Sequence, residues 1–506
     1  MGSYKPGGTL KYLIILVPLL LAGIAAANPP WSANVVAGDV GDSINEGESC
    51  IASDGDYIYS LCNWAERGTY AGLTYGRSTD GGQTWTSSLW KDASVGIPWH
   101  TDPFILVDDS GYVHLFCQFS STVLRHYLST DHGVTWSDSV NASENLPDGT
   151  VDKPWGVMRG NNIYVAWQQW GATQEGIIFA KSTDRGRSWN RTVADPTRTG
   201  ITGICLSPSG IIYLMNRYWG DDGVFCTKST DQGATWAPWV TVDPTCSYNT
   251  GYGDRAPLPS IAAPTDSNVV IVWVDDGLGD WDIVYSRSTD RGLTWSPTAR
   301  LPDSSAGGQC KSWVTADFRG DLHFMWYHTP SWPTSSSSWW SIRYAHSEDY
   351  GATISPSIRL NDTVFRSPVT FMGEYHVIVT DSTYARAVWT DGRAGDNSLY
   401  FAQAELTAIG VEENPWRVTR IPELTLEVPT IARGSALPVS FAVLRPGTLS
   451  LAVFDAAGRE LASVNLGHRT AGNYNELLTG LPLDQTLFVK LTSGSTMVTR
   501  KALLVR

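Results

Sequence analysis

One eight-residue string recurs six times along the chain and constrains its fold more than any other feature. The pattern is S-x-D-x-G-x-[TS]-W, and the sixth copy keeps everything except the tryptophan. Successive copies begin 51, 53, 47, 59 and 59 residues apart. They occupy residues 78–85, 129–136, 182–189, 229–236, 288–295 and 347–354. A period of this length indicates a repeat architecture, in which similar units pack side by side.

The residue types in the string predict a clamped hairpin turn. The aspartate at its third position can accept hydrogen bonds from backbone N–H groups of the turn, and the glycine at its fifth position supplies a positive φ. The tryptophan then buries a large ring between strands. The aspartates are therefore predicted to be structural: Asp80, Asp131, Asp184, Asp231, Asp290 and Asp349. Calcium binding or catalysis by Asp80 or Asp184 is the alternative interpretation.

Short strand patterns accompany the string and number seven, one more than the string itself. They end most often in a large apolar ring and occupy residues 58–62, 113–117, 163–167, 212–216, 269–273, 322–326 and 385–389. The seventh unit lacks the string, but residues 31–35 read like the strand that follows it elsewhere. We therefore predict an all-β, seven-bladed β-propeller over residues 31–406, closed by an N-terminal strand.

The repeated string resembles the Asp box of sialidase-type, or BNR-repeat, propellers. This resemblance implies a ligand face opposite the Asp boxes, and a chain that acts on or binds glycans, with exo-α-sialidase activity as the narrower expectation. The Arg-Ile-Pro signature of sialidases is missing from residues 45–77 and occurs only at residues 420–422, after the propeller. Sialidases of this family also resemble six-bladed rings. The alternative function is a non-catalytic surface propeller that binds protein partners.

Loops that enter the first strand of each unit, or join the second and third, are rich in tryptophan and charge. Asp102 is the candidate acid/base, and Arg255 and Arg366, with Arg67 or Arg217, are candidates to grip a sugar carboxylate. Glu46, Glu48, Asp152, Asp254 and Glu175 supply further carboxylates, the last two as candidates to polarise a tyrosine nucleophile. Candidate ligand-binding residues are Trp99, Lys153, Trp155, Trp170, Arg217, Trp281, Lys311, Trp313 and Trp340. The alternative is a solvated rim with ion pairs between blades.

The segment from residue 412 to residue 506 has a different pattern. It has no Asp box, few tryptophans and short alternating strands, which predict a small β-sandwich. Residues 451–459, 471–474 and the ending 499–506 resemble type IX secretion sorting domains, and the immunoglobulin-like domain of flagellar hook-capping proteins. The resemblance implies outer-membrane secretion machinery as a partner. A plain accessory sandwich is the alternative.

The N-terminal 27 residues resemble a secretory signal peptide. Lys5 and Lys11 precede an apolar run, which ends in small residues at 25–27. A membrane anchor is the alternative, but the run is interrupted by Pro18 and is short for a span. We therefore expect domains at 1–27, 28–411 and 412–506, and a monomer that is secreted or attached to the outer-membrane surface.

Charge and cysteine content exclude several other classes of function. The formal net charge of −14 argues against a protein that binds nucleic acid through its phosphates. The seven cysteines show no spacing typical of zinc ligands, and we expect them to pack as small apolar side chains. No cofactor is expected, although structural calcium remains an alternative.

Overall fold

The structure is a computed structural model of the whole chain. It describes residues 31–41, 45–66, 69–92, 100–119, 122–143, 149–171, 175–198, 200–218, 223–246, 259–277, 279–303, 306–331, 334, 337–367, 372–406, 424–429, 431–443, 447–455, 459–470, 472–493 and 496–505. The predicted signal peptide lies outside these residues. The chain divides into two compact units, Met1–Glu412 and Glu413–Arg506.

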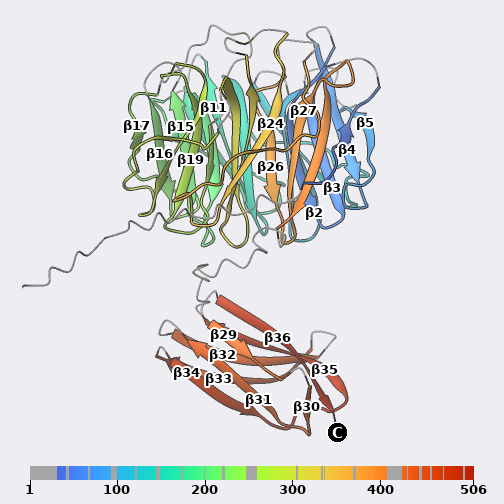
Figure 1. Cartoon of the computed structure of the whole chain (residues 1–506), viewed down its shortest axis with the longest axis vertical. Coiled ribbons are helices and arrows are strands. Elements are labelled where there is room, and N and C mark those ends of the chain that lie inside the picture. The colour runs from blue at the N-terminus through green and yellow to red at the C-terminus, as the bar shows by residue number, and fades with distance from the viewer. Residues whose placement is uncertain are drawn as a thin grey trace, which may run out of the picture. The chain divides into compact units, whose positions relative to one another are not determined.

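In its described residues, the first unit consists of seven four-stranded antiparallel sheets (Figure 1). The first three are β2 (Asn45–Asp54), β3 (Tyr57–Glu66), β4 (Thr69–Ser78) and β5 (Thr86–Trp90); β6 (His100–Val107), β7 (Val113–Phe119), β8 (Val123–Ser129) and β9 (Val140–Asn141); and β10 (Thr150–Arg159), β11 (Asn162–Trp170), β12 (Gly176–Ser182) and β13 (Asn190–Asp195). The next three are β14 (Gly200–Leu206), β15 (Ile212–Tyr218), β16 (Val224–Ser229) and β17 (Val240–Asp243); β18 (Ser260–Ala262), β19 (Val269–Asp275), β20 (Asp282–Ser288) and β21 (Ala299–Arg300); and β22 (Gly308–Ala316), β23 (Leu322–Thr329), β24 (Ser341–Ser347) and β25 (Ile358–Arg359). The last contains β26 (Val377–Thr380), β27 (Tyr384–Asp391), β28 (Ser398–Glu405) and β1 (Val35–Gly38).

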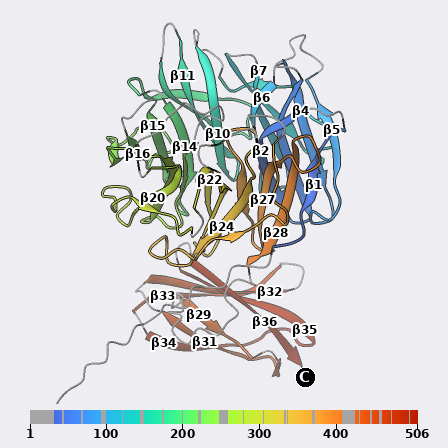
Figure 2. The same cartoon turned by 45° about the horizontal axis from the view of Figure 1, so that its top comes forward.

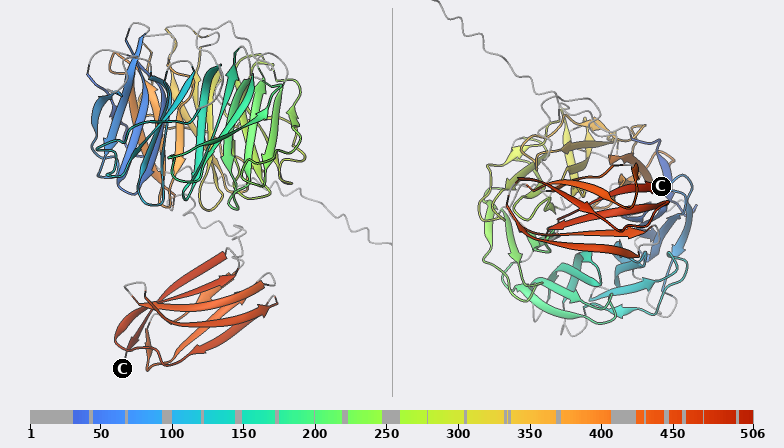
Figure 3. Two further views of the ribbon diagram at one scale, coloured as in Figure 1. Left: turned by 180° about the vertical axis from the view of Figure 1, so that it is seen from behind. Right: turned by 90° about the horizontal axis from the view of Figure 1, so that it is seen from below.

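The sheets close into a ring around an axis (Figure 3). The first strands β2, β6, β10, β14, β18, β22 and β26 contact each other in this order, and β26 contacts β2 again. In the last sheet, β1 pairs with β28 through Val35–Phe401 and Val36–Tyr400, and the backbone N–H of Ser32 bonds the carbonyl of Gln403 at 2.8 Å. The N-terminal strand β1 thus supplies the fourth strand of the last sheet. This pairing confirms the prediction of a seven-bladed propeller closed by an N-terminal strand.

Tryptophans at the ends of second strands form much of the core between blades. Trp167, Trp273, Trp326 and Trp389 are fully buried. They occupy equivalent positions in β11, β19, β23 and β27, which belong to four of the sheets that stand side by side around the axis (Figure 2). The seven cysteines are all free and buried, as expected for small apolar side chains.

Each Asp box closes the turn between the third and fourth strand of its blade. In the first, Asp80 Oδ1 accepts from the Thr84 N–H at 2.9 Å and from the Ser78 hydroxyl at 2.8 Å. The Thr84 hydroxyl donates to Asp80 Oδ2 at 2.6 Å, and these bonds lower the pKa of Asp80 to about 2. Equivalent bonds hold Asp131, Asp184, Asp231, Asp290 and Asp349. These bonds all lie within the turn of each copy, as the predicted structural role requires.

The glycine of the Asp box is required by backbone conformation and by space. Gly233 has a φ of 84°, and a Cβ there would lie 2.0 Å from the ring of Phe179. The preceding residue is also left-handed in every copy, which the sequence pattern did not reveal. The box tryptophans are half-buried rather than fully buried.

The second unit contains a three-stranded and a five-stranded sheet in its described residues. The strands are β29 (Leu424–Glu427), β31 (Leu437–Val443) and β34 (Gly472–Leu478); and β30 (Ile431–Arg433), β36 (Thr496–Val505), β35 (Gln485–Ser493), β32 (Gly447–Asp455) and β33 (Glu460–Arg469). Leu451, Val489 and Phe441, among others, form one apolar core from both sheets. This is the predicted β-sandwich. No helix among the described residues has the length and apolar character required to cross a membrane.

Candidate functional site

Four first strands share an irregularity near their beginning. The pairing of β2, β6, β10 and β22 with the next strand is shifted there by a β-bulge. Each bulge contains a charged residue with a positive φ: Glu48 (60°), Asp102 (47°), Lys153 (50°) and Lys311 (56°). A left-handed conformation is uncommon outside glycine, and bulges redirect side chains near functional sites. The four bulges therefore place four charged residues at the same height along the propeller axis.

Lys153 gathers the charged side chains at this level. Its Nζ lies 3.1 Å from Glu48 Oε1 and 3.4 Å from Asp102 Oδ1, and it also pairs with Glu374. With Asp152, these residues form what we term the axial cluster. Glu48 and Asp102 are buried, whereas the Lys153 and Glu374 side chains each remain 12% exposed. The cluster therefore reaches the surface at Lys153 and Glu374.

The environment of the axial cluster drives the pKa values of two carboxyls in opposite directions. Burial raises the pKa of Glu48 well above its usual value, and Asp102 and Glu374 add to this increase while Lys153 opposes it. Burial alone would also raise the pKa of Asp102, but Lys153 and hydrogen bonds from Glu48 and Lys153 outweigh burial and lower it. Of the two carboxyls, Glu48 is thus the one that gains a proton more readily, and Asp102 the one that loses its proton more readily.

Neighbouring side chains hold these carboxyls in place. The Asn63 amide donates to Glu48, and the Gln168 amide donates to Asp152 Oδ2 at 2.6 Å. Burial raises the pKa of Asp152 to about 6, with Lys153 opposing the increase. Burial lowers the pKa of Lys153, but Asp102, Glu48 and Glu374 outweigh this effect and raise it well above its usual value. The lysine is therefore a permanent cation among four carboxyl groups.

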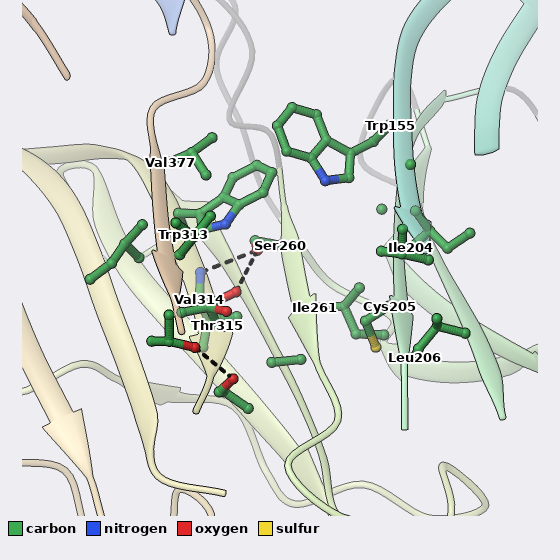
Figure 4. Close-up of a pocket in the computed structure, with 18 of the residues that line it drawn as sticks. Trp155, Ile204, Cys205, Leu206, Ser260, Ile261, Trp313, Val314, Thr315 and Val377 are labelled. Carbon is green, nitrogen blue, oxygen red and sulfur yellow. Dashed lines mark hydrogen bonds between the residues drawn. The ribbon is translucent and has the colours of Figure 1, made fainter. Parts of the chain in front are cut away.

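Three aromatic rings close in sequence to the axial cluster contact each other and form what we term the aromatic layer. Trp155 and Trp313 follow the bulge lysines 153 and 311 by two residues, and their ring centroids lie 4.6 Å apart (Figure 4). The ring of Tyr375 lies 5.6 Å from that of Trp155. Lys153 forms ion pairs in the axial cluster, whereas Lys311 donates to the carbonyl of Gly373. Trp155 and Trp313 line one axial cavity, which Lys153 also lines.

The structure places the sequence-predicted site residues in different environments. Asp102 and Lys153 meet in the axial cluster, and Trp155 and Trp313 lie half-buried in the aromatic layer rather than on an exposed rim. Lys311 is buried and donates to the carbonyl of Gly373. It thus shares the bulge geometry of Lys153, but the ion pairs of the cluster are formed by Lys153.

Three other candidates occupy positions unsuited to ligand binding. Trp281 and Trp340 are buried in the core between blades, at 1% and 5% exposure, so their ring faces are covered by protein. Their expected role in ligand binding is corrected accordingly: apolar burial outweighed a place on the rim. Arg217 is buried, and its Nε donates to Cys246 Sγ at 3.0 Å.

Exposed candidates lie away from the cluster's ion pairs. Arg366 is exposed, with its guanidinium 4.3 Å from the ring centroid of Trp339, and the Trp170 side chain is 37% exposed. Glu175 is also exposed. Trp99, Arg67, Asp254 and Arg255 lie outside the described residues. An arginine cluster for a sugar carboxylate is therefore not formed by Arg217 and Arg366, the two candidate arginines that the structure describes.

Sequence reasoning missed Glu374 and Tyr375. Both precede the short strand β26, in the blade that lacks an Asp box, so no repeat aligned them with Glu48 or Asp102. A useful signal was available: in each case a charged residue lies shortly before the apolar core of a first strand. Among the described residues, no group of three or more His, Cys, Asp or Glu side chains is arranged to hold a metal ion.

The fold of this chain is similar to those of several solved structures, at low sequence identity. No protein-family model matches the chain, and no curated protein matches it. A polysaccharide lyase, the ulvan lyase of family PL25, aligns at 11% identity over 73% of this chain and 95% of its own, with a TM-score of 0.48. The Hadza microbial sialidase Hz136 aligns at 16% identity, covering 74% and 69%, with a TM-score of 0.42. An α-L-arabinanase from Penicillium chrysogenum aligns at 14% identity, covering 75% and 100%, with a TM-score of 0.42. Similarity at this level says nothing about activity.

Proposed function

We propose that the propeller binds a glycan over the axial cluster and hydrolyses a glycosidic bond there. The observation that carries this proposal is the carboxyl pair Glu48 and Asp102, whose pKa values are shifted in opposite directions around Lys153. Glycoside hydrolysis uses one protonated and one ionised carboxyl about 5–9.5 Å apart. In this proposal the hydrogen bond between Glu48 and Asp102 therefore opens as the sugar enters between them. The resemblance of the repeats to Asp-box propellers supports the same class of ligand.

In this proposal the two carboxyls have separate roles. Glu48 donates its proton to the glycosidic oxygen as the bond from the sugar carbon to that oxygen breaks. Asp102 accepts a proton from the attacking water, whose oxygen forms the new bond to the same carbon. Lys153 is a positioning residue, since it holds Asp102 ionised through their 3.4 Å contact.

The charge of the cluster favours a neutral sugar. Glu48, Asp102, Asp152 and Glu374 surround one lysine, so an anionic sugar would meet an excess of carboxylate. A sialidase-type activity is the narrower form of the proposal. It depends on Arg255 and Arg366 gripping the carboxylate of the sugar, a pairing that the sequence suggested.

Turnover of a panel of 4-methylumbelliferyl glycosides by the full-length protein tests the proposal. We expect neutral glycosides to be cleaved faster than a sialoside. Asp102→Asn and Glu48→Gln should each lower kcat/KM by roughly 10²- to 10⁴-fold, the usual contribution of a general acid or base. Asp138→Asn, at an exposed position, is the matched control and should leave turnover unchanged.

The outcomes separate the alternatives. Glycan binding on an array without turnover would reduce the proposal to a glycan-binding propeller. A blank result in both assays would reject glycans and favour a propeller that binds protein partners. Equal turnover by wild type and both cluster variants would remove the cluster from the chemistry.

We also propose that the chain is exported, with the second unit as a sorting domain. The sequence of residues 1–27 and the ending 499–506 support this. Export of the full chain, compared with one lacking residues 499–506, tests it. Unchanged export of the shortened chain would reject a sorting role.

A further inference from the structure

The seven first strands enclose a channel along the axis, and the aromatic layer forms part of its lining. Its volume is about 660 Å³, and residues of β2, β6, β10, β14, β18, β22 and β26 line it. Trp155, Trp313 and Tyr375 line it at the end where Lys153 of the axial cluster also lines it. Pro208 and Phe318, which follow β14 and β22, line the other end. Because first and third strands run the same way, the channel opens on the Asp-box face.

The backbone edges that face the channel are largely satisfied by protein where the strands of three blades meet. A first strand has one unpaired edge, which would make the wall polar. On β22, however, the Ser260 hydroxyl accepts from the Val314 N–H at 3.1 Å and donates to the Val314 carbonyl at 3.2 Å (Figure 4). The Thr380 hydroxyl donates to the Ala316 carbonyl at 3.1 Å. This part of the wall therefore presents side chains rather than free backbone groups.

The side chains that line the channel are mainly apolar. Val157, Leu206 and Val379 line it and are only half-buried, and Phe318 near the mouth is 68% exposed. Among the described lining residues, Lys153 and Asp317 carry charge, and both are paired. Lys153 belongs to the axial cluster, and Asp317 accepts from Arg319 Nε at 2.8 Å. The channel thus offers no charged group to hold an ionic ligand.

The dimensions suit a narrow ligand. Five residue steps separate Trp313 from Phe318, which corresponds to roughly 16 Å of extended chain. A volume of about 660 Å³ over that length gives a cross-section of roughly 40 Å², and the volume falls within the range of small-molecule sites. An extended alkyl chain or a single row of aromatic rings would fill it.

We propose that the axial channel is a second binding site, for an uncharged, elongated apolar molecule that enters from the Asp-box face. Its apolar part would displace water from Val157, Leu206 and Val379 and end against the rings of Trp155 and Trp313. The site borders the axial cluster at Lys153, but it does not depend on the proposed glycosidase activity.

Binding of N-phenyl-1-naphthylamine to the full-length protein tests the site, because this uncharged probe gains fluorescence in apolar surroundings. We expect saturable enhancement, competed by 1-dodecanol. Leu206→Glu and Val379→Glu, which place a charge in the channel, should each weaken binding by at least about tenfold. Val134→Glu and Leu293→Glu are matched controls, since both residues are exposed (63% and 60%) in Asp boxes of the same face.

Three results would overturn the proposal: no enhancement with wild type, equal enhancement in all four variants, or loss only in the two surface controls. If the glutamate variants fail to fold, Val379→Trp, which fills the channel without adding charge, should give the same loss of binding. Bound N-phenyl-1-naphthylamine should quench the tryptophan emission less in Trp313→Phe than in the wild type.

Discussion

The two ends of the propeller blades share a repeated backbone but differ in how much their side chains vary. At the Asp-box end, six turns use the same residue types, and each aspartate is held by local bonds within four residues. At the opposite end, four first strands share a bulge, but the left-handed residue is a glutamate, an aspartate or a lysine. The repeated turns give each blade the same shape, which allows the blades to pack into a ring. The charged residues at the bulges differ from blade to blade, and this difference creates the axial cluster.

This difference also separates local from long-range electrostatics. Hydrogen bonds within the turn lower the pKa values of Asp80, Asp131, Asp184, Asp231 and Asp290, and that of Asp131 falls to about 2. The axial carboxyls depend on Lys153, which lies 105 residues from Glu48 in the chain. Changes at the two ends should therefore differ greatly in their effect, which three experiments can test.

The largest effect is expected from Lys153→Met. Removing the cation leaves the buried carboxyls of Glu48 and Asp102 without compensation, and loss of one partner from a buried ion pair costs about 3–5 kcal/mol. Urea unfolding followed by tryptophan fluorescence measures the loss. Lys181→Met is the control, since Lys181 bonds Gln232 at an exposed position and should matter little. Equal losses for the two variants would contradict the contrast between the ends.

The second effect is acid sensitivity that arises inside the blades. His114 Nδ1 and His126 Nε2 lie 3.0 Å apart, and His126 Nδ1 lies 3.2 Å from the carbonyl of Gly186 in the next Asp box. Burial lowers the pKa of His114 to about 4 and that of His126 to about 3. Below about pH 6.5 the unfolded chain therefore binds more protons than the folded chain. The free energy of unfolding consequently decreases as the pH falls.

Each of these histidines should contribute about 1.4 kcal/mol of destabilisation per pH unit between pH 6.5 and its folded pKa. Asp152 works in the opposite direction, because its pKa is raised to about 6 in the folded state. Unfolding free energies at several values between pH 7 and pH 4.5 measure the slope. His126→Gln should flatten it, whereas His468→Gln in the second unit serves as the control. An unchanged slope for His126→Gln would exclude the pair as the acid-sensitive element.

The smallest effect is expected from a single Asp box. Asp184→Ala removes the bonds from the Ser188 N–H (2.9 Å) and hydroxyl (2.6 Å). Because the carboxylate is mostly exposed, the cost should be roughly 1 kcal/mol. The exposed Asp138→Ala is the comparison, with thermal unfolding as the measurement. A loss as large as that of Lys153→Met would show that the boxes are as critical as the cluster.

Much of the fold could be predicted because its signals are local. The spacing of Asp80 and its equivalents indicated the turns, and the ring of Trp167 and its equivalents indicated the buried second strands. The order of sheets then followed from the chain, and the strand at Val35 from its likeness to strands that follow an Asp box. Even here, the left-handed residue before each box glycine went unseen, since residues as different as His132 and Gln232 occupy it.

The site was predicted less well, because its members come from distant parts of the chain. Asp102 and Lys153 were among the candidates, but nothing local distinguished Lys153 from Lys311, which instead bonds a backbone carbonyl. Trp281 and Trp155 were both assigned to a rim by their position in loops. Burial then placed one in the core and the other on the axis.

By itself, the sequence determined the all-β class, the seven units and the structural role of the Asp-box aspartates, since each depends on bonds or periodicity within a few residues. Only the tertiary structure decided which charged residues meet. Closing the ring brings Glu48, Asp102, Lys153 and Glu374 to one level of the axis, and their mutual distances set each ionisation state. Coulombic interaction depends on separation in space, which no spacing along the chain reveals.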